Sequence, residues 1–261
     1  MANGFYNFNS AEIKFISWLT YDKIKIISYR DLDKYLPKNY RYKNRFISNL
    51  IKKKVLIPIK KEVYMFVPVE ALLTGTTVNP YMLPKIYYPK MQYYIGYFNM
   101  FNKYGLTEQI PQITYVINTS VSGKKIISKF QFQFVKVKKG YIYGLEEFNT
   151  SDGKITISDK ERTMIDFIDK WNFKEAKDKL SDIFKQNNCD IKKFIKYAVL
   201  FPKARTRKFA GVILDYSNIS ERLTKPLYES IKNTALISVS KSSRKGIINA
   251  KWGVIENVTQ Q

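Results

Sequence analysis

The side chains that support common enzyme chemistry are scarce in this sequence. It contains no histidine and one cysteine, Cys189. Without an imidazole there is no Ser-His-Asp triad, no Cys-His pair and no histidine base, and an ordinary zinc site lacks its ligands. Any catalysis would therefore have to use carboxylates and lysines, together with a metal ion such as magnesium.

The carboxylates form no clear catalytic set. The acid-x-Lys pattern of metal-dependent nucleases occurs in Asp152-Gly-Lys154, Glu175-Ala-Lys177 and Asp190-Ile-Lys192. In a chain with 45 Lys and Arg residues, such matches arise by chance. Asp166 follows Arg162 by one helical turn, which is the spacing of a structural ion pair. We therefore predict no catalytic residues, no metal and no cofactor, and we do not expect an enzyme.

The net charge is the strongest signal in the composition. Basic residues number 45 and acidic residues 22, which gives a formal charge of +23 at pH 7. Such an excess favours a polyanionic partner, and nucleic acid is the first candidate. No stretch approaches the roughly 18 apolar residues of a membrane span, and no secretory signal is recognisable. With a single cysteine, these features indicate a cytoplasmic protein with no membrane partner.

The first 70 residues predict three helices followed by a β-hairpin. The helices are expected over residues 11–20, 28–36 and 40–53, and the two strands over residues 55–59 and 63–67. Ser10 is the expected N-cap of the first helix, and Ser28 with Asp31 forms a weak capping box for the second. This order of elements is that of a winged helix-turn-helix.

Charge is concentrated on the third predicted helix and the hairpin. Residues 37–61 include nine basic residues and no acidic one, which is typical of a helix that enters the major groove of DNA and of a wing beside it. The alternative is a solvated basic helix in a small three-helix domain. The candidate DNA-contacting residues are Tyr40, Arg41, Tyr42, Asn44, Arg45, Ser48, Asn49, Lys52, Lys53, Lys60 and Lys61.

These residues suit different contacts with double-stranded DNA. Arg41 and Arg45 lie one turn apart and have the geometry to bind guanine, while Asn44 or Asn49 suits adenine. The lysines are better placed for phosphates, which fix position without reading sequence. By its phase, Lys43 falls near the buried face, so either its amine extends towards solvent or the helix starts later.

A second domain of mixed α/β structure is expected over residues 91–261, after a Gly- and Pro-containing linker over 72–90. Its strands are expected over residues 113–118, 126–137, 141–148 and 155–157, and its helices over 93–104, 159–171, 174–185, 191–201, 206–216 and 221–233. Two extended pieces follow, near residue 237 and over 252–258. The whole chain is thus assigned to the α+β class.

Most of the positive charge lies in this second domain. One run of seven basic residues stands between Asp190 and Asp215. It is interpreted either as a solvated helix face or as a second nucleic-acid surface. The densest part follows Pro202 and consists of Lys203, Arg205, Arg207 and Lys208.

Four segments in order resemble the AbiEi-type antitoxins of bacterial and archaeal toxin–antitoxin and phage-abortive systems. Residues 46–56 with Val63-Tyr64 are similar to the family's recognition helix and wing, and residues 94–111 to its linker-helix signature. Residues 155–166 resemble its most recognisable motif, and residues 252–257 its closing strand. The resemblance covers nearly the whole chain.

The resemblance implies a phage-defence antitoxin with two functions. A winged helix-turn-helix over residues 1–71 would bind inverted-repeat operator DNA and repress its own operon. A C-terminal antitoxin domain over residues 91–261 would neutralise a cognate nucleotidyltransferase-like toxin, directly or indirectly. The chain departs from the family at Glu62, where the wing turn usually carries glycine, and at residues 97–99, where small residues are usual. The alternatives are a stand-alone winged-helix regulator and a metal-dependent nuclease.

Overall fold

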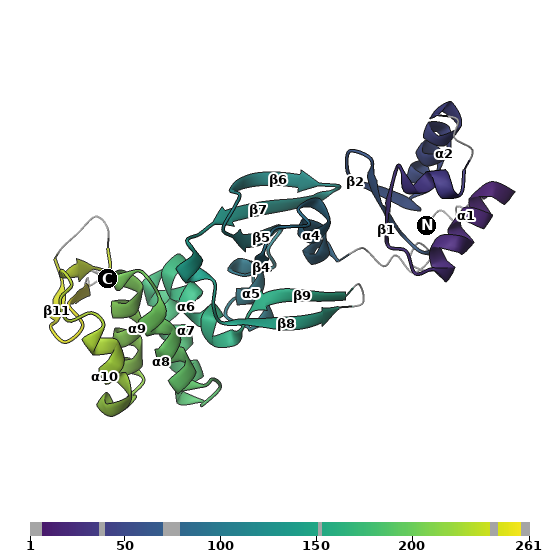
Figure 1. The fold of residues 1–261 in the computed structure, drawn as a ribbon. Helices are drawn as coiled ribbons and strands as arrows, with labels where there is room; N and C mark the ends of the chain where they lie inside the picture. Colours follow the sequence, from purple (N-terminus) through teal and green to yellow (C-terminus); the bar gives the residue numbers. More distant parts are fainter. Residues whose placement is uncertain (1–6, 37–39, 70–78, 151–152, 241–244, 257–261) are drawn as a thin grey trace. The chain divides into compact units, whose positions relative to one another are not determined.

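The computed structural model describes residues 7–36, 40–69, 79–150, 153–240 and 245–256 (Figure 1). The chain divides into two compact units. The first comprises Met1–Met91, Lys125–Phe132 and Thr150–Gly153, and the second comprises Gln92–Lys124, Gln133–Asn149 and Lys154–Gln261. The mixture of helices and strands agrees with the predicted α+β class.

The first unit begins with α1 (Ser10–Tyr21), β1 (Ile26–Ser28) and the short 3-10 helix η1 (Asp31–Lys34). They are followed by α2 (Tyr40–Lys52), β2 (Leu56–Lys60) and β3 (Val63–Phe66). The three strands form an antiparallel sheet in the order β1-β3-β2. The stretch predicted as a linker holds two further elements, η2 (Pro80–Met82) and α4 (Leu83–Tyr87).

A capping box fixes the start of α1. Asn9 Oδ1 accepts a hydrogen bond from the Glu12 amide, and the Glu12 carboxylate accepts one from the Asn9 amide, both at 2.9 Å. These reciprocal bonds satisfy two amides that no helical carbonyl reaches. The prediction of Ser10 as the N-cap is therefore wrong by one residue, because Ser10 is already helical.

The second predicted helix is only one 3-10 turn in the described residues. Its predicted capping interaction is confirmed, since the Ser28 hydroxyl and amide both donate to the Asp31 carboxylate, at 2.7 and 2.9 Å. The side-chain bond and then the backbone bond lower the pKa of Asp31. The helix is shorter than predicted because Ser28 belongs to β1 and the Tyr29 amide donates to the Glu62 carbonyl, so the chain is still extended there. At the other end, Pro37 disfavours helical backbone at the residue before it.

The second sheet has six strands in the order β6-β7-β5-β4-β9-β8 (Figure 1). They are β4 (Tyr93–Ile95), β5 (Ile113–Asn118), β6 (Gly123–Ile127), β7 (Phe130–Lys136), β8 (Leu145–Thr150) and β9 (Gly153–Ser158). In the chain, α5 (Phe98–Lys103) lies between β4 and β5, and η3 (Lys139–Tyr141) between β7 and β8. β4 pairs antiparallel with β5 and parallel with β9.

Five helices and a small sheet complete the second unit. The helices are α6 (Lys160–Lys170), α7 (Phe173–Lys185), α8 (Ile191–Leu200), α9 (Ala204–Tyr216) and α10 (Glu221–Glu229). The sheet has the order β10-β12-β11 and consists of β10 (Ile237–Ser238), β11 (Ile247–Asn249) and β12 (Val254–Glu256). α9 is the central helix, because it packs against α6, α7, α8 and α10.

Two elements predicted after residue 91 are wrong. The helix expected over 93–104 is the strand β4 followed by the shorter helix α5, although Gly105 ends that helix as predicted, with a φ of +69°. The strand expected over 126–137 is the hairpin of β6 and β7, which turns at Ser128, where φ is +57°. Both errors have the same cause. The chain changes direction within one or two residues, and the aromatic and β-branched residues on both sides give no sign of the turn.

The predicted ion pair on α6 is confirmed. Arg162 Nη2 lies 2.9 Å from Asp166 Oδ1, and both side chains are completely buried. They lie among the helices of a large apolar core that includes Phe167 of α6, Phe194 of α8 and Phe209 of α9. The pair therefore belongs to the interior of the unit and not to a surface.

None of the helices in the described ranges has the length and the apolar character that crossing a membrane requires. In the same ranges, no group of three or more Asp, Glu or Cys side chains is placed to hold a metal ion.

Candidate nucleic-acid interface

α2 presents a polar, basic stripe to solvent. Arg41, Arg45, Ser48 and Lys52 are exposed, and their spacing of four, three and four residues places them along one side of the helix. Asn44 and Asn49 are half-buried beside this stripe, and Tyr42 is 41% exposed. The helix contains no acidic residue. Tyr40 is the first residue of α2, and its side chain lies outside the described part of the structure.

The opposite side of α2 anchors the helix in the core of the first unit. Phe46, Ile47 and Leu50 are buried there, against residues of α1 and the sheet. The Phe46 ring meets Phe15 of α1 edge to face, with ring centroids 5.4 Å apart. This anchoring fixes the rotation of α2 and therefore which side chains face solvent.

Lys43 is a buried cation on the core side of α2. It is 5% exposed, and its amine forms an ion pair with Asp33 of η1. Its amine also lies 5.0 Å from the centre of the Tyr29 ring. The prediction that Lys43 falls near the buried face is confirmed, and the carboxylate of Asp33 compensates its charge. Lys43 therefore links α2 to η1.

Lys53 is used inside the unit as well. Its amine donates to a Glu12 carboxylate oxygen at 2.6 Å and to the Asn7 carbonyl at 2.7 Å. Glu12 is completely buried, so the ion pair with Lys53 compensates an otherwise costly charge. The assignment of Lys53 as a phosphate contact is therefore corrected: its amine is engaged 41 residues away in the sequence, at the start of α1.

The hairpin after α2 carries further cations. α2 ends where Lys54 adopts the left-handed conformation, with a φ of +60°. At the turn between β2 and β3, Lys61 is exposed and Glu62 has a φ of +59°. Glycine adopts left-handed backbone more readily than any other residue, so Glu62 occupies a position that favours glycine. Lys60 is half-buried and donates one hydrogen bond to the Tyr87 carbonyl at 3.2 Å.

Arg30 and Lys34 are among the exposed cations of this unit that the sequence did not single out. Arg30 precedes η1 and Lys34 ends it. The ion pair between Lys43 and Asp33 joins η1 to α2, so these two side chains belong to the same part of the unit. Their position relative to α2 depends on that tertiary contact, which periodicity does not show.

The second predicted surface, at the start of α9, is not a continuous basic patch. Lys203 forms a two-pronged ion pair with Asp169, at 2.8 and 2.9 Å. Burial raises the pKa of Asp169, but the hydrogen bonds from Lys203 and Thr206 outweigh this effect. The net shift of the pKa is downward. Arg205 is exposed and donates to the Val239 carbonyl at 3.3 Å, while Arg207 is half-buried.

Lys208 is excluded from any surface. It is 1% exposed, and its amine donates to the carbonyls of Ala235, Gly253 and Thr234 at 2.7, 3.2 and 3.4 Å. Burial lowers its pKa. Gly253 adopts a φ of +61°, and a side chain there would lie 2.7 Å from the Lys208 amine. Lys208 therefore links α9 to residues 234, 235 and 253. Its assignment to a nucleic-acid surface is wrong.

We expect Lys208→Met to lower the free energy of unfolding by about 1–3 kcal/mol, because three carbonyl oxygens lose their charged donor. Urea unfolding followed by tryptophan fluorescence measures this, since Trp252 is completely buried next to Gly253. Lys225→Met, at an exposed position of α10, is the matched control and should stay within about 0.5 kcal/mol. Equal stability of the two variants would contradict the structural role of Lys208.

Comparisons with known proteins bear on the fold. The crystal structure of the RV2827C protein from Mycobacterium tuberculosis is similar, with a TM-score of 0.65 and 10% sequence identity. The match covers 95% of this chain and 92% of that chain. No protein-family model matches the sequence, and no curated protein does. At this identity the likeness concerns the fold alone: the chain shares its overall architecture with RV2827C over nearly its whole length.

Proposed function

We propose that residues 1–71 form a winged helix-turn-helix that binds double-stranded DNA. α2 would be the recognition helix, and the hairpin of β2 and β3 the wing. The observation that carries this proposal is the exposed stripe of Arg41, Arg45, Ser48 and Lys52 on a helix without acidic residues. The element order and the sheet order β1-β3-β2 support it, because they place a hairpin directly after that helix.

Within this interface the side chains have distinct roles. Arg41 and Arg45 are suited to guanine, whose O6 and N7 atoms accept two hydrogen bonds from one guanidinium. Asn44 and Asn49, at the edges of the stripe, are suited to adenine. The remaining contacts go to phosphates, which position the protein on the duplex. These phosphate contacts are assigned to Ser48, Lys52, Lys60 and Lys61, with Tyr42 beside them.

We further propose that the protein is an antitoxin that represses its own operon and counteracts a nucleotidyltransferase-like toxin. The support is the resemblance of four segments to AbiEi-type antitoxins. These segments fall on defined elements: α2 with β2 and β3, then β4 with α5, then β9 with α6, and finally β12. The segment on α6 includes the buried pair of Arg162 and Asp166, which gives it a structural reason to keep its residue types.

One experiment tests both parts of the proposal with the full-length chain. The protein is titrated against DNA from upstream of its own gene, and it is co-expressed with the product of an adjacent nucleotidyltransferase gene. We expect saturable binding to an inverted repeat and relief of the toxin's growth arrest. DNA binding without relief of the growth arrest would overturn the antitoxin role and favour a stand-alone regulator. Magnesium-dependent cleavage of DNA or RNA by the pure protein, abolished by Glu175→Gln, would favour a nuclease.

Lys52→Ala is expected to weaken binding to all DNA sequences alike, because a phosphate contact carries no sequence information. The slope of the logarithm of the binding constant against the logarithm of the salt concentration should fall by about one unit. Fluorescence anisotropy titrations at several salt concentrations measure it. Lys14→Ala, at an exposed position of α1, is the control with an unchanged slope. A loss confined to one sequence would instead place Lys52 on a base.

A further inference from the structure

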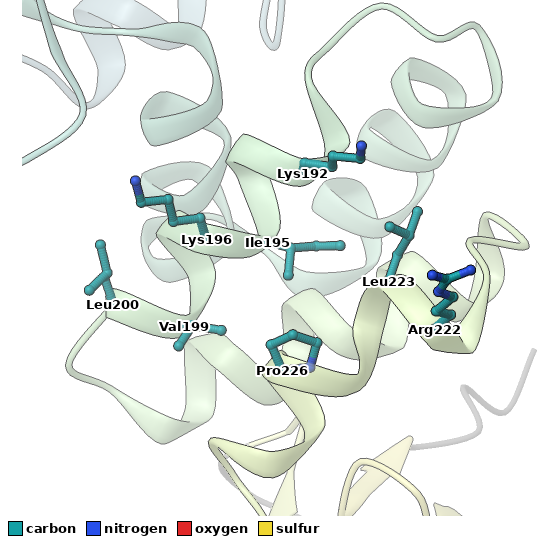
Figure 2. Close-up of a pocket in the computed structure, with 8 residues that line it drawn as sticks. All are labelled: Lys192, Ile195, Lys196, Val199, Leu200, Arg222, Leu223 and Pro226. Carbon is teal, nitrogen blue, oxygen red and sulfur yellow. The ribbon is translucent and has the colours of Figure 1, made fainter.

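A groove with an apolar floor and a cationic rim runs between α8 and α10 of the second unit. Its volume is about 450 Å³. Figure 2 shows apolar side chains, including Ile195 and Pro226, between Lys196 on one side and Arg222 on the other. The lining residues are Lys192, Ile195, Lys196, Val199, Leu200, Arg222, Leu223 and Pro226.

The floor of the groove is aliphatic and partly open to solvent. α8 buries Phe194 and Ala198 in the core, while Ile195, Val199 and Leu200 of the same helix line the groove. Leu200 is 51% exposed at the end of α8. Pro226 lies inside α10 and adds an apolar ring instead of an amide donor. Covering an exposed leucine beside such a groove with another apolar surface removes both from water and therefore stabilises the complex.

The rim carries positive charge that the unit does not compensate. Lys192 and Lys196 lie one turn apart on α8, where two like charges destabilise a helix. The neighbouring Lys193 shows the contrast, since it forms ion pairs with Asp159 and Glu161 at 3.1 and 3.0 Å. In the described residues, neither rim lysine nor Arg222 has an ion pair, and no acidic residue lines the groove.

We propose that this groove binds an acidic, amphipathic segment of a partner protein. Apolar side chains of the segment would cover the floor, and its carboxylates would pair with the rim cations, as in other helix-in-groove complexes. Single-stranded nucleic acid fits less well, because it relies on aromatic side chains for base stacking, and no residue lining the groove is aromatic. The inference goes beyond DNA binding by α2 and does not depend on it.

The test uses a fluorescein-labelled, 16-residue helical peptide with leucines on one face and glutamates on the other. A peptide of the same composition in scrambled order is its control. Anisotropy titrations with the full-length protein should give saturable binding at least tenfold tighter for the amphipathic peptide. Lys192→Glu/Lys196→Glu should weaken that binding at least tenfold. Leu200→Asp, at a position that is already half-exposed, should weaken it at least fivefold without unfolding the protein.

Lys174→Glu/Lys179→Glu is the matched charge control, because it changes the net charge by the same amount as the rim variant. Lys174 and Lys179 are exposed on α7 and do not line the groove. Equal effects of this control and of the rim variant would overturn the proposal, since the attraction would then come from net charge alone. Equal binding of the two peptides would also overturn it. So would tighter, rim-dependent binding of a 16-nucleotide single strand, or a rim-dependent dimer in sedimentation experiments, because each would assign the groove to another occupant.

Discussion

The variant Arg41→Ala/Arg45→Ala is expected to lose most of its preference for the operator over unrelated DNA. Each arginine is exposed on α2, one turn from the other, and suited to one guanine. Each single substitution should cost about 1–3 kcal/mol of specific binding, because a bidentate contact to a base is lost. The double variant should lose more than either single variant. Binding to unrelated DNA should weaken less, since the phosphate contacts remain.

The measurement begins with operator sequences selected from a random double-stranded DNA pool by the unchanged protein. Affinities of the variants for the selected and for unrelated DNA then give the change in specificity. Both arginines are exposed, so their removal should leave the unfolding free energy within about 0.5 kcal/mol. Lys14→Ala on α1 controls for the loss of one charge in each single variant. Unchanged operator affinity in the double variant would mean that another face of α2, or another element, reads the bases.

The exposed face of α2 follows from the sequence because a single periodicity determines it. The apolar residues that recur at helical spacing and predict the buried side are Phe46, Ile47, Leu50 and Ile51. The structure buries the first three, and Ile51 is half-buried. The same phase places Lys43 on the buried side, where the structure has it. For α2 the local apolar pattern alone gives the orientation of the two faces, without knowledge of the partners that the helix packs against.

Whether each cation on such a face is open to solvent or paired inside the protein is not a local property. Lys53 pairs with Glu12, and Lys208 reaches carbonyls of residues 234, 235 and 253. These partners lie 26 to 45 residues away in the sequence. A charge run shows how many cations a segment has, but tertiary contacts decide which of them face solvent. For this reason Lys203–Lys208 does not form the continuous surface that its density indicated.

The same limit explains how the groove between α8 and α10 escaped sequence analysis. The run after Asp190 indicated a basic helix face, and Lys192 and Lys196 are indeed exposed on it. Arg222 belongs to a different helix, α10, and lies 26 residues after Lys196 in the sequence. Only the packing of α10 against α8 brings the three cations around one apolar floor.

Removal of one partner from the Arg162–Asp166 pair is expected to have the largest effect on stability. The guanidinium donates to Asp166 at 2.9 and 3.2 Å and to the Tyr94 hydroxyl at 3.3 Å. It also lies 4.5 Å from the centre of the Tyr143 ring. Asp166→Leu leaves the buried cation without its counter-charge, and we expect a loss of about 3–5 kcal/mol in unfolding free energy. Urea unfolding measures the loss.

The double variant Arg162→Met/Asp166→Leu separates the charge effect from the packing effect. Replacing a buried ion pair by apolar side chains of similar size is often neutral or stabilising, so the double variant should be more stable than either single variant. If Asp166→Leu does not fold, Asp166→Asn keeps one oxygen for Arg162 and should fall between it and the unchanged protein. A double variant that loses the sum of the two single losses would contradict the coupling, because each side chain would then act through its own packing alone.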